Sequence, residues 1–441
     1  MNDDRYVAAI EISSSKIVAA IGMMHDDGRL DIIATEQEKG VESVRYGILQ
    51  NLEETAMRIN RVIDRLQRKP SVSPRVITGL YVGLSGRSLR SITTEVSMSL
   101  PDDTEINDEI LRRLRDQALA TAIDSSLEVV DAIPRVYMVG KSETRSPKGA
   151  IGNRIHATFD LIVCRPELRR NLQRTISDKL DIRINGFVVT ALSAAQVLLT
   201  SEEKRLGCML VDMGAETTTV SIYKDGGLRY LATLPMGGRN ITRDITSLSV
   251  LEERAEDIKI TMGNAIARDT ASNLNMNGIR MSEVGNLIVA RSEEIVANVV
   301  EQLKYAGMKD SDLPAGLICI GGGTKLNGML DLLARQTALP VRRGQLPTYI
   351  HLEDPKAPLS EILQVASVLY SGGSESAEEC LQVPGTRELP VTGEGNLPEE
   401  DTPDNRTEAR RKKKSNRWGG FTRRISELFS GPGEDDSDIL E

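Results

Sequence analysis

The stretch VAAIEISSSKIVAAI, residues 7–21, sets a short polar turn between two apolar runs. The turn consists of small or charged side chains, namely Glu11, Ser13, Ser14, Ser15 and Lys16. Apolar runs of strand length that flank small polar residues predict a β-hairpin, with strands at 6–12 and 16–22. Apolar strands of this kind are expected to be buried, so the turn brings a carboxylate, hydroxyls and an ammonium group to the edge of a core.

A related pattern occurs 201 positions later, where IEISSSKIVAAI (residues 10–21) aligns with VDMGAETTTVSI (residues 211–222). In this alignment Asp212 takes the place of Glu11, Gly214 that of Ser13 and Thr217 that of Lys16. Each copy has a strand, a carboxylate, a hairpin of small residues and a second strand. Similarity at this spacing indicates two related lobes.

The chemistry of both hairpins favours a phosphate clamp. A tight turn of small residues can direct backbone N–H groups into a nest for anionic oxygens. A carboxylate at the strand end, Glu11 in one copy and Asp212 in the other, can hold Mg²⁺ through water. Two ordinary β-hairpins with an incidental acid remain the alternative at this point.

A third segment, GLICIGGGTKLNGM (residues 316–329), favours the clamp. It reads as a short strand, three glycines and a helix that begins near Thr324. Glycine has no Cβ, so a base or sugar can lie against the backbone there, and the helix N-terminus would add a positive dipole end.

Bulk composition excludes several classes of protein. The chain has 441 residues, 40% of them hydrophobic and 27% charged, with a net charge of −9, which argues against nucleic acid as the main partner. No apolar run reaches the roughly 18 residues of a membrane span. The four cysteines form no disulfide or zinc pattern, which indicates a reducing cytosol.

The predicted elements are those of a mixed α/β protein. Besides the two hairpins, we expect strands at 80–84, 95–100, 133–139, 155–164, 184–189, 208–213, 217–223 and 316–320. Helices are expected at 50–68, 105–122, 166–180, 191–199, 243–266, 283–305 and 324–337. In the predicted insert, residues 82–165, Ile106, Ile110, Leu114 and Ala118 share one helix face, and the strand at 155–163 alternates apolar residues.

Two phosphate hairpins followed by a glycine triplet resemble the actin superfamily, and within it the FtsA family of bacterial cell-division proteins. The segments VGLSGRSLRSITTEVSMS (82–99) and EVVDAIPRVYMVGKSETRSPKGAIGNRIHATFDLIVCRPE (128–167) resemble the entry and exit of that family's inserted subdomain. LPMGGRNITRDI (234–245) and AEDIK (255–259) are similar to its GGxxIT and AExxK signatures. The resemblance covers nearly all of residues 5–372 and implies a two-lobed actin-like ATPase fold.

The resemblance also implies roles for single residues with ATP and Mg²⁺. The first phosphate loop would be lined by Ser13, Ser14, Ser15 and Lys16. The second would be lined by Asp212, Gly214 and Thr217, with Gly238 beside the phosphates, and Glu11 and Asp212 would lie near Mg²⁺. The adenosine would be bordered by Gly321, Gly322, Gly323 and Lys325. Glu256 and Lys259 would face the ribose, although a surface ion pair at i,i+3 is the alternative.

Four positions depart from the family pattern. Glu11 stands where the family has aspartate, Ser13 and Glu216 stand where it has glycine, and Thr219 stands where it has aspartate. Glu216 is expected to repel a bound phosphate, because two charges about 4 Å apart interact by roughly 1–4 kcal/mol depending on screening. Tight nucleotide binding is therefore expected less firmly than the fold.

The composition changes near Gly372. Residues 373–409 contain ten Asp or Glu and two Arg, which predicts a disordered linker. The resulting division is 1–81, first lobe; 82–165, inserted subdomain; 166–372, rest of the first lobe and second lobe; 373–409, linker; 410–430, basic amphipathic helix; 431–441, acidic tail.

The segment RKKKSNRWGGFTRRISELF (411–429) predicts a membrane-binding helix. At about 100° per residue, one face gathers its large apolar side chains, Trp418, Phe421, Ile425, Leu428 and Phe429. Cations including Arg423 and Arg424 flank this face, as in helices that lie among anionic lipid headgroups. Docking on the protein's own body, or binding of nucleic acid by a basic arm, are the alternatives. The FtsA family carries a similar tail.

The resemblance implies an ATP-binding cell-division protein that assembles with itself on the cytoplasmic face of the plasma membrane, at the septum. It would anchor the tubulin-like FtsZ ring and recruit other division proteins. At most slow ATP hydrolysis is expected, and no small-molecule phosphotransfer. A small-molecule kinase of the same superfamily and a PilM-like membrane-associated assembly protein remain the alternatives.

Overall fold

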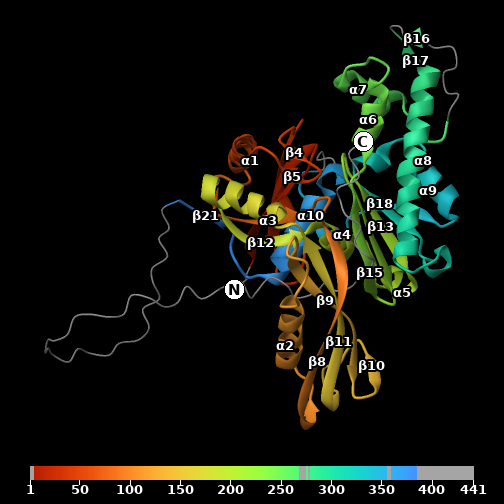
Figure 1. Ribbon diagram of the computed structural model, residues 1–441. Coiled ribbons are helices and arrows are strands. Elements are labelled where there is room, and N and C mark those ends of the chain that lie inside the picture. Colours follow the sequence, from red (N-terminus) through yellow and green to blue (C-terminus); the bar gives the residue numbers. More distant parts are fainter. Residues whose placement is uncertain (1–3, 268–274, 277–278, 355–358, 385–441) are drawn as a thin grey trace, which may run out of the picture.

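The computed structural model describes residues 4–267, 275–276, 279–354 and 359–384, which form two lobes and a protruding insert (Figure 1). The first lobe is built on a six-stranded sheet with the order β12-β7-β1-β2-β3-β20. Its antiparallel part comprises β1 (Arg5–Ile12), β2 (Lys16–Met24) and β3 (Leu30–Lys39). Its parallel part comprises β7 (Gly79–Leu84) and β12 (Arg183–Val189) beside β1, and β20 (Ile350–Leu352) beside β3.

The second lobe repeats this plan. Its antiparallel strands are β13 (Cys208–Met213), β14 (Thr218–Lys224) and β15 (Gly227–Leu234). Two parallel strands, β18 (Leu317–Ile320) and β19 (Val341–Arg343), follow on the other side of β13. The two sheets thus share one order and one set of strand directions: β12-β7-β1-β2-β3 in the first lobe corresponds to β19-β18-β13-β14-β15 in the second. The relation between lobes predicted from the two hairpins is confirmed.

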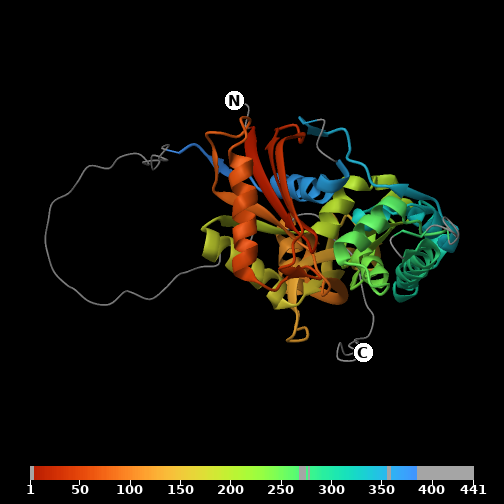
Figure 2. The ribbon, with the colours of Figure 1, turned by 90° about the horizontal axis from the view of Figure 1, so that it is seen from above.

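Helices bury both faces of the first sheet, which explains why its central strands are apolar on both sides. Figure 2 shows α1 (Leu52–Gln67) and α10 (Leu359–Glu375) on opposite faces of the sheet. In α1, Asn51 caps the N-terminus by accepting a hydrogen bond from the backbone N–H of Glu54, and Ile59, Val62, Ile63 and Leu66 are buried. The central strands carry fully buried residues on successive positions, as in Val7, Ala8, Ala9 and Ile10.

The insert lies between β7 and the return of the chain to the first lobe. It contains β8 (Arg90–Glu105), α2 (Asp108–Leu119), β9 (Glu128–Val139), β10 (Ser142–Thr144) and β11 (Ile151–Cys164). The insert has a hydrophobic core of its own. This core buries the predicted helix face and the alternating strand residues Ile155, Ala157, Phe159, Leu161 and Val163. A single pairing of Arg90 with Ala232 joins its sheet to the second lobe, giving the order β10-β9-β11-β8-β15-β14-β13-β18-β19.

The remaining elements connect these sheets. The helices are α3 (Pro166–Gln173) with a π-helical turn η1 (Arg174–Asp178), α4 (Thr190–Leu198), α5 (Ser201–Leu206), α6 (Gly238–Thr246), α7 (Glu252–Met262), α8 (Met281–Tyr305) and α9 (Met329–Thr337), with the 3₁₀ turns η2 (Asp310–Asp312) and η3 (Gly322–Lys325). The short strands are β4 (Val44–Arg45), β5 (Ile48–Leu49), β6 (Val76–Ile77), β16 (Asn275–Met276), β17 (Ile279–Arg280) and β21 (Leu381–Gln382).

Two predicted helices are wrong in their bounds. The predicted helix 243–266 is two helices, α6 and α7, separated by a turn in which Ser249 has a φ of 61°. The predicted helix 324–337 begins only at Met329, because Gly328 adopts a left-handed conformation with φ 75°. A 3₁₀ turn, η3, instead begins within the glycine triplet at Gly322 and ends at Lys325, so the expected helix N-terminus does not lie at Thr324.

The predicted start of the linker at Gly373 is also wrong. Helix α10 continues to Glu375, and β21 pairs with β6 of the first lobe, with Cys380 fully buried between them and β1. A Cβ at Gly372 would lie 2.4 Å from the ring of Tyr81, so glycine permits the close approach of α10 to β7. Three predicted segments lie outside the described residues: the linker from residue 385 onward, the amphipathic helix 410–430 and the acidic tail 431–441.

Within the described parts of the chain, no helix combines the length and the apolar character needed to cross a membrane. The four cysteines, all in described segments, are free and buried.

The insert's core can be tested by one substitution. Phe159 is fully buried and contacts Tyr137 edge to face, with ring centroids 6.2 Å apart. We expect Phe159→Ala to lower the free energy of unfolding of the insert by about 3–5 kcal/mol, because it leaves a cavity among well-packed residues. Urea denaturation followed by circular dichroism measures the loss. Ile151→Ala, at a side chain that is 66% exposed, is the control and should change it by less than about 0.5 kcal/mol.

Candidate nucleotide cleft

The two predicted hairpins have the same backbone geometry. In hairpin 1 (residues 13–16), between β1 and β2, the N–H of Ser13 donates to the carbonyl of Lys16 at 2.9 Å. In hairpin 2 (residues 214–217), between β13 and β14, the N–H of Gly214 donates to the carbonyl of Thr217 at 2.8 Å. These are the residues that the sequence alignment of the two copies places together.

The tips of both hairpins offer free backbone donors. Among the residues that the structure describes, no hydrogen bond partner is recorded for the amides of Ser14 and Ser15 in hairpin 1, or of Ala215 and Glu216 in hairpin 2. Successive unpaired N–H groups in a tight turn form a concave site for anionic oxygens. Both turns therefore suit phosphate groups.

The three serines of hairpin 1 do different things. The hydroxyl of Ser13 donates to the carbonyl of Lys16 at 2.9 Å and accepts from its amide at 3.3 Å, so it closes the turn itself. This contact gives the Ser13 side chain a structural role within the turn. The hydroxyl of Ser14 accepts from the N–H of Gly47 at 3.3 Å. Ser15 is the serine whose hydroxyl has no recorded partner in the described chain, and it is half-buried.

The two strand-end carboxylates lie together under the hairpins. Glu11 is 4% exposed, and burial raises its pKa to about 7; Lys16 opposes this shift and Asp212 adds to it. Burial also raises the pKa of Asp212, although Gln364 donates to both of its oxygens at 3.0 Å. Glu11 is buried and Asp212 is partly buried, and the charge of Asp212 adds to the cost of ionising Glu11, so a cation would be favoured at this point.

An unsatisfied hydroxyl lies beside this pair. Oγ1 of Thr190, at the start of α4, is buried and makes no hydrogen bond to the described chain. A Cβ at Gly83 would lie 3.0 Å from this oxygen and 3.4 Å from Cγ of Glu11, so Thr190 and Glu11 flank the same glycine. A buried polar atom without a partner calls for water or a ligand, which fits a hydrated Mg²⁺ at this point.

No group of three or more metal-ligating side chains occurs in the described residues. Mg²⁺ commonly takes only one or two carboxylates and completes its octahedron with water and phosphate oxygens. Two carboxylates such as those of Glu11 and Asp212 have the chemistry that such a metal takes, and their role with Mg²⁺ stays a prediction.

Three lysines surround one glutamate at the first lobe's side of the cleft. Lys16 Nζ donates to the backbone carbonyl of Glu361, on α10. Lys39 Nζ lies 3.0 Å from the Glu361 carboxylate, and Lys325 Nζ lies 3.9 Å from it. Burial lowers the pKa of Lys16; the charges of Glu11 and Glu361 oppose this shift, and those of Lys325 and Lys39 add to it. The ammonium of Lys325, which the resemblance assigns to the adenosine, thus lies close to the charge of hairpin 1.

The glycine triplet abuts the second lobe's carboxylate and hairpin. A Cβ at Gly321 would lie 2.6 Å from Oδ1 of Asp212, and one at Gly323 would lie 2.5 Å from Cγ of Met213. At Gly322 no atom of the described chain lies within 4 Å of a Cβ position. The middle glycine therefore faces open space while its neighbours are closely packed.

Helix α6 ties the GGxxIT signature to hairpin 2. The N–H of Gly238 donates to the carbonyl of Gly214 at 3.0 Å, so the helix begins against the hairpin. Lys259 of α7 donates to the carbonyl of Gly238 at 3.1 Å and to Glu256 at 2.6 Å. The Lys259 side chain is 13% exposed and that of Glu256 43% exposed, so the pair lies partly at the surface and is anchored to α6 through the carbonyl of Gly238. The ribose contact of Glu256 and Lys259 stays a prediction.

The expected repulsion from Glu216 is wrong. Its side chain has no exposed surface and contacts three arginines: Arg45 at 2.9 Å, Arg239 at 3.3 Å and Arg243 at 2.7 Å. Burial would raise the pKa of Glu216, but a hydrogen bond from the N–H of Tyr46 and the arginines hold that pKa below its ordinary value. The charge that looked unfavourable from the sequence is more than neutralised by the fold.

Sequence reasoning missed several of these residues. Gln364 and Glu361 lie on α10, a helix absent from the predicted elements; its apolar period in LSEILQVASVLY (359–370) could have revealed it. Arg239 lies inside LPMGGRNITRDI (234–245), a segment in which the GGxxIT pattern indicates the glycines but not the arginine. No local signal marks Arg45 or Thr190, because their importance arises from contacts with residues far away in the chain.

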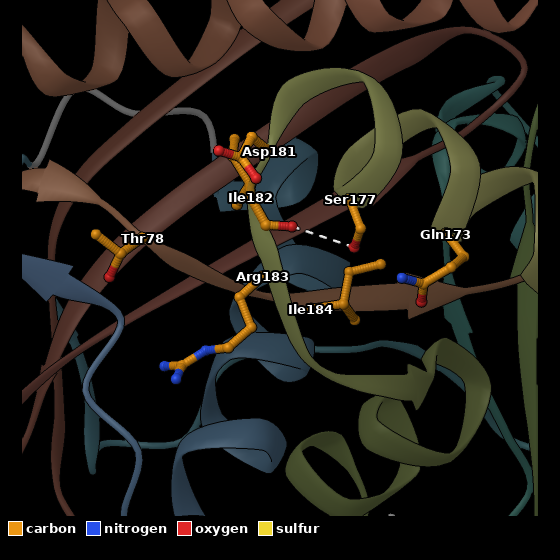
Figure 3. A pocket seen from close by; sticks show the side chains of 7 residues that line it. All are labelled: Thr78, Gln173, Ser177, Asp181, Ile182, Arg183 and Ile184. Carbon is orange, nitrogen blue, oxygen red and sulfur yellow. Dashed lines mark hydrogen bonds between the residues drawn. The ribbon is translucent and has the colours of Figure 1, made fainter. Parts of the chain in front are cut away.

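A separate cavity of about 380 Å³ lies outside this cleft, between η1 and β12 of the first lobe (Figure 3). It is lined by Thr78, Gln173, Ser177, Asp181, Ile182, Arg183 and Ile184. The Ser177 hydroxyl donates to the carbonyl of Ile182 at 3.2 Å. None of the predicted site residues lines this cavity.

The different surroundings of Gly322 and Gly323 allow a matched test. We expect Gly323→Ala to lower the free energy of unfolding by about 1–3 kcal/mol, since its Cβ would overlap Met213. Gly322→Ala should change it by less than about 0.5 kcal/mol, because its Cβ enters open space. Guanidinium denaturation of both variants measures the difference. Equal losses would contradict the described packing of the triplet.

Two family models match the chain. The model described as "Cell division protein FtsA" matches residues 209–359, and the one described as "SHS2 domain inserted in FTSA" matches residues 86–163. The first match contains hairpin 2, the GGxxIT and AExxK signatures and the glycine triplet. The second coincides with the insert β8 to β11.

Curated relatives cover most of the chain. Cell division protein FtsA of Porphyromonas gingivalis is 34% identical over 357 residues, which are 77% of this chain and 74% of that protein. FtsA of Pseudomonas aeruginosa is 28% identical over 77% of this chain and 83% of that protein. FtsA of Bacillus subtilis is 28% identical over 81% of this chain and 82% of that protein.

A solved structure shares the fold. A chain of the "PilM-PilN type IV pilus biogenesis complex" superimposes with a TM-score of 0.58 and 16% sequence identity, over 84% of this chain and 99% of that one. At this identity the likeness concerns the two-lobed fold alone. Three findings agree: the family matches, the identity to the Porphyromonas gingivalis protein, and the two-lobed fold with its insert. The chain belongs to the FtsA family of actin-like cell-division proteins.

Proposed function

We propose that this protein binds Mg²⁺ and ATP between its lobes and uses the bound nucleotide to favour the closed, assembly-competent form of a division scaffold. The observation that carries the proposal is the pair of hairpins with matching hydrogen bonds, at the ends of equivalent strands of two equivalent sheets. A ligand that spans both hairpins would stabilise closure in proportion to its preference for that state.

The side chains of the cleft have complementary parts in this proposal. The free amides of both hairpins would bind phosphate oxygens, and Lys16 would neutralise part of their charge. Glu11 and Asp212 would hold Mg²⁺ through water, and the metal would offset the remaining phosphate charge. The open space at Gly322 would admit the flat nucleoside against the backbone.

The scaffold role includes partners and a place in the cell. We propose that the chain assembles with itself, contacts FtsZ and other division proteins, and binds anionic lipids at the cytoplasmic face of the plasma membrane at the septum. The support for membrane binding is the basic amphipathic segment 410–430, which follows an acidic stretch of the sequence. The matched FtsA relatives support a role at the division site.

At most slow ATP hydrolysis is proposed for the cleft, and no transfer of phosphate to a small molecule. A kinase of this superfamily would need a general base beside a substrate pocket. A coupled assay over a panel of sugars and carboxylic acids separates the two: rapid phosphorylation of any of them would favour the kinase.

Nucleotide binding can be tested at Lys16. We expect Lys16→Ala to weaken binding of a fluorescent ATP analogue, in the presence of Mg²⁺, by about 10- to 100-fold, because a charge-assisted contact to phosphate is lost. Titration by fluorescence anisotropy measures the affinity. Lys148→Ala is the matched control, since that lysine is exposed and pairs with Asp108 on the insert. Wild-type affinity in the Lys16 variant would refute the phosphate role of hairpin 1.

Membrane binding can be tested by truncation. The full chain should sediment with vesicles that contain anionic phospholipid, and a variant without residues 411–441 should stay in the supernatant. Raising the salt concentration should weaken sedimentation of the full chain, because the basic side chains act through a screened potential. Vesicles of neutral phosphatidylcholine are the lipid control. Equal sedimentation of both proteins would disprove the anchor.

A further inference from the structure

The carboxylate of Glu216 joins the two lobes at the phosphate hairpins. Glu216 belongs to hairpin 2 in the second lobe. Its partners Arg239 and Arg243 lie on α6, in the same lobe. Arg45 and Tyr46 belong to the first lobe, where they lie between β3 and α1. The guanidinium of Arg45 lies 2.9 Å from Oε1 of Glu216, and the N–H of Tyr46 donates to Oε2 at 2.8 Å.

The same group also reaches hairpin 1. The guanidinium of Arg239 donates to the carbonyl of Ser14 at 3.1 Å, and the N–H of Gly47 donates to the Ser14 hydroxyl at 3.3 Å. Hairpin 1 is therefore contacted by Arg239, which also contacts Glu216, and by Gly47, which follows Tyr46 in the chain. Both phosphate hairpins are connected through one buried carboxylate.

The strength of this connection follows from burial and charge. The Glu216 side chain has no exposed surface, and hydrogen bonds to an ionised group in a desolvated site are the stronger kind. Three guanidinium groups around one carboxylate leave a surplus of positive charge next to hairpin 2. The surplus can favour a nearby phosphate without any direct contact from Glu216.

We propose that Glu216 is a positioning residue. With Arg45 and Tyr46 it forms a contact between the lobes, which we call the Glu216 latch. The Glu216 latch sets the spacing of the two phosphate hairpins, and it must break before nucleotide enters or leaves. This inference rests on the proposed nucleotide site and adds to it the control of access. It also gives a role to the glutamate that replaces the usual glycine of the second hairpin.

The latch has a kinetic consequence that a phosphate contact lacks. In this proposal the latch keeps the lobes mostly closed before nucleotide binds, and bound nucleotide adds to that preference. Loss of the latch then destabilises the closed form equally with and without nucleotide, so the affinity stays nearly unchanged. Opening becomes easier in both forms. The association and dissociation rates then rise by the same factor, whereas loss of a phosphate contact mainly raises the dissociation rate and weakens affinity.

The test uses Arg45→Gln in the full chain. The Arg45 side chain is 42% exposed, so its replacement disturbs little packing, and Arg239 and Arg243 still balance the buried charge of Glu216. Stopped-flow mixing with a fluorescent ATP analogue and Mg²⁺ should show both rate constants raised about tenfold, equivalent to 1.4 kcal/mol, with the dissociation constant changed less than twofold. Arg45→Lys should restore most of the slow exchange. Unchanged rates, or a weaker affinity at an unchanged association rate, would overturn the latch.

A control and a nucleotide-free measurement separate this inference from the proposed function. Arg205→Gln removes an arginine that pairs with Glu202 inside α5, and it should leave both rate constants at wild-type values. Without nucleotide, hydrogen exchange of the Tyr46 and Gly47 amides should be faster in Arg45→Gln than in wild type. If the wild-type protein fails to bind the analogue, the proposed function is wrong and this exchange alone decides the latch. Equal exchange rates would then reject it.

Discussion

The whole arrangement depends on one constraint: two polar hairpin turns must face each other at the edge of a continuous apolar core. Each turn is held by the same short backbone hydrogen bond, from Ser13 to Lys16 in one lobe and from Gly214 to Thr217 in the other. The flanking strands are buried on both faces, so neither turn can move without disturbing its sheet. Both turns are accordingly anchored in the buried strands of their lobes.

Charge balance is the second requirement of such a cleft. Burial raises the pKa of both Glu11 and Asp212, while cations gather around Glu361 on one side and Glu216 on the other. In each cation cluster one glutamate holds basic side chains together that would otherwise repel one another. Acidic and basic groups thus lie in separate places beside the two hairpins, which suits the proposed binding of a metal ion and a polyphosphate.

The insert and the body have different relations to known proteins. The two-lobed body is shared with the pilus biogenesis structure at 16% identity, so the fold alone does not specify cell division. The insert is matched by a model specific to the FtsA family, and it has a hydrophobic core of its own joined to the second lobe through one strand pairing. The family assignment therefore depends on the sequence of insert and body together with the overall identity to FtsA relatives.

The sequence by itself determined the strand–turn–strand repeat, the buried faces of the insert and the residues of the two hairpins, because these depend on local periodicity and small-residue turns. Tertiary structure decided the rest. Gly372 lies where the composition begins to resemble a linker, yet it lets α10 approach Tyr81. The 3₁₀ turn Gly322–Lys325 includes two glycines of the triplet, and α9 begins only after Gly328, which has a left-handed conformation. Glu216 looks repulsive in the sequence and is neutralised by Arg45, Arg239 and Arg243. A charge in a folded protein takes its energy from neighbours that lie far away along the chain, and only folding brings those neighbours within reach.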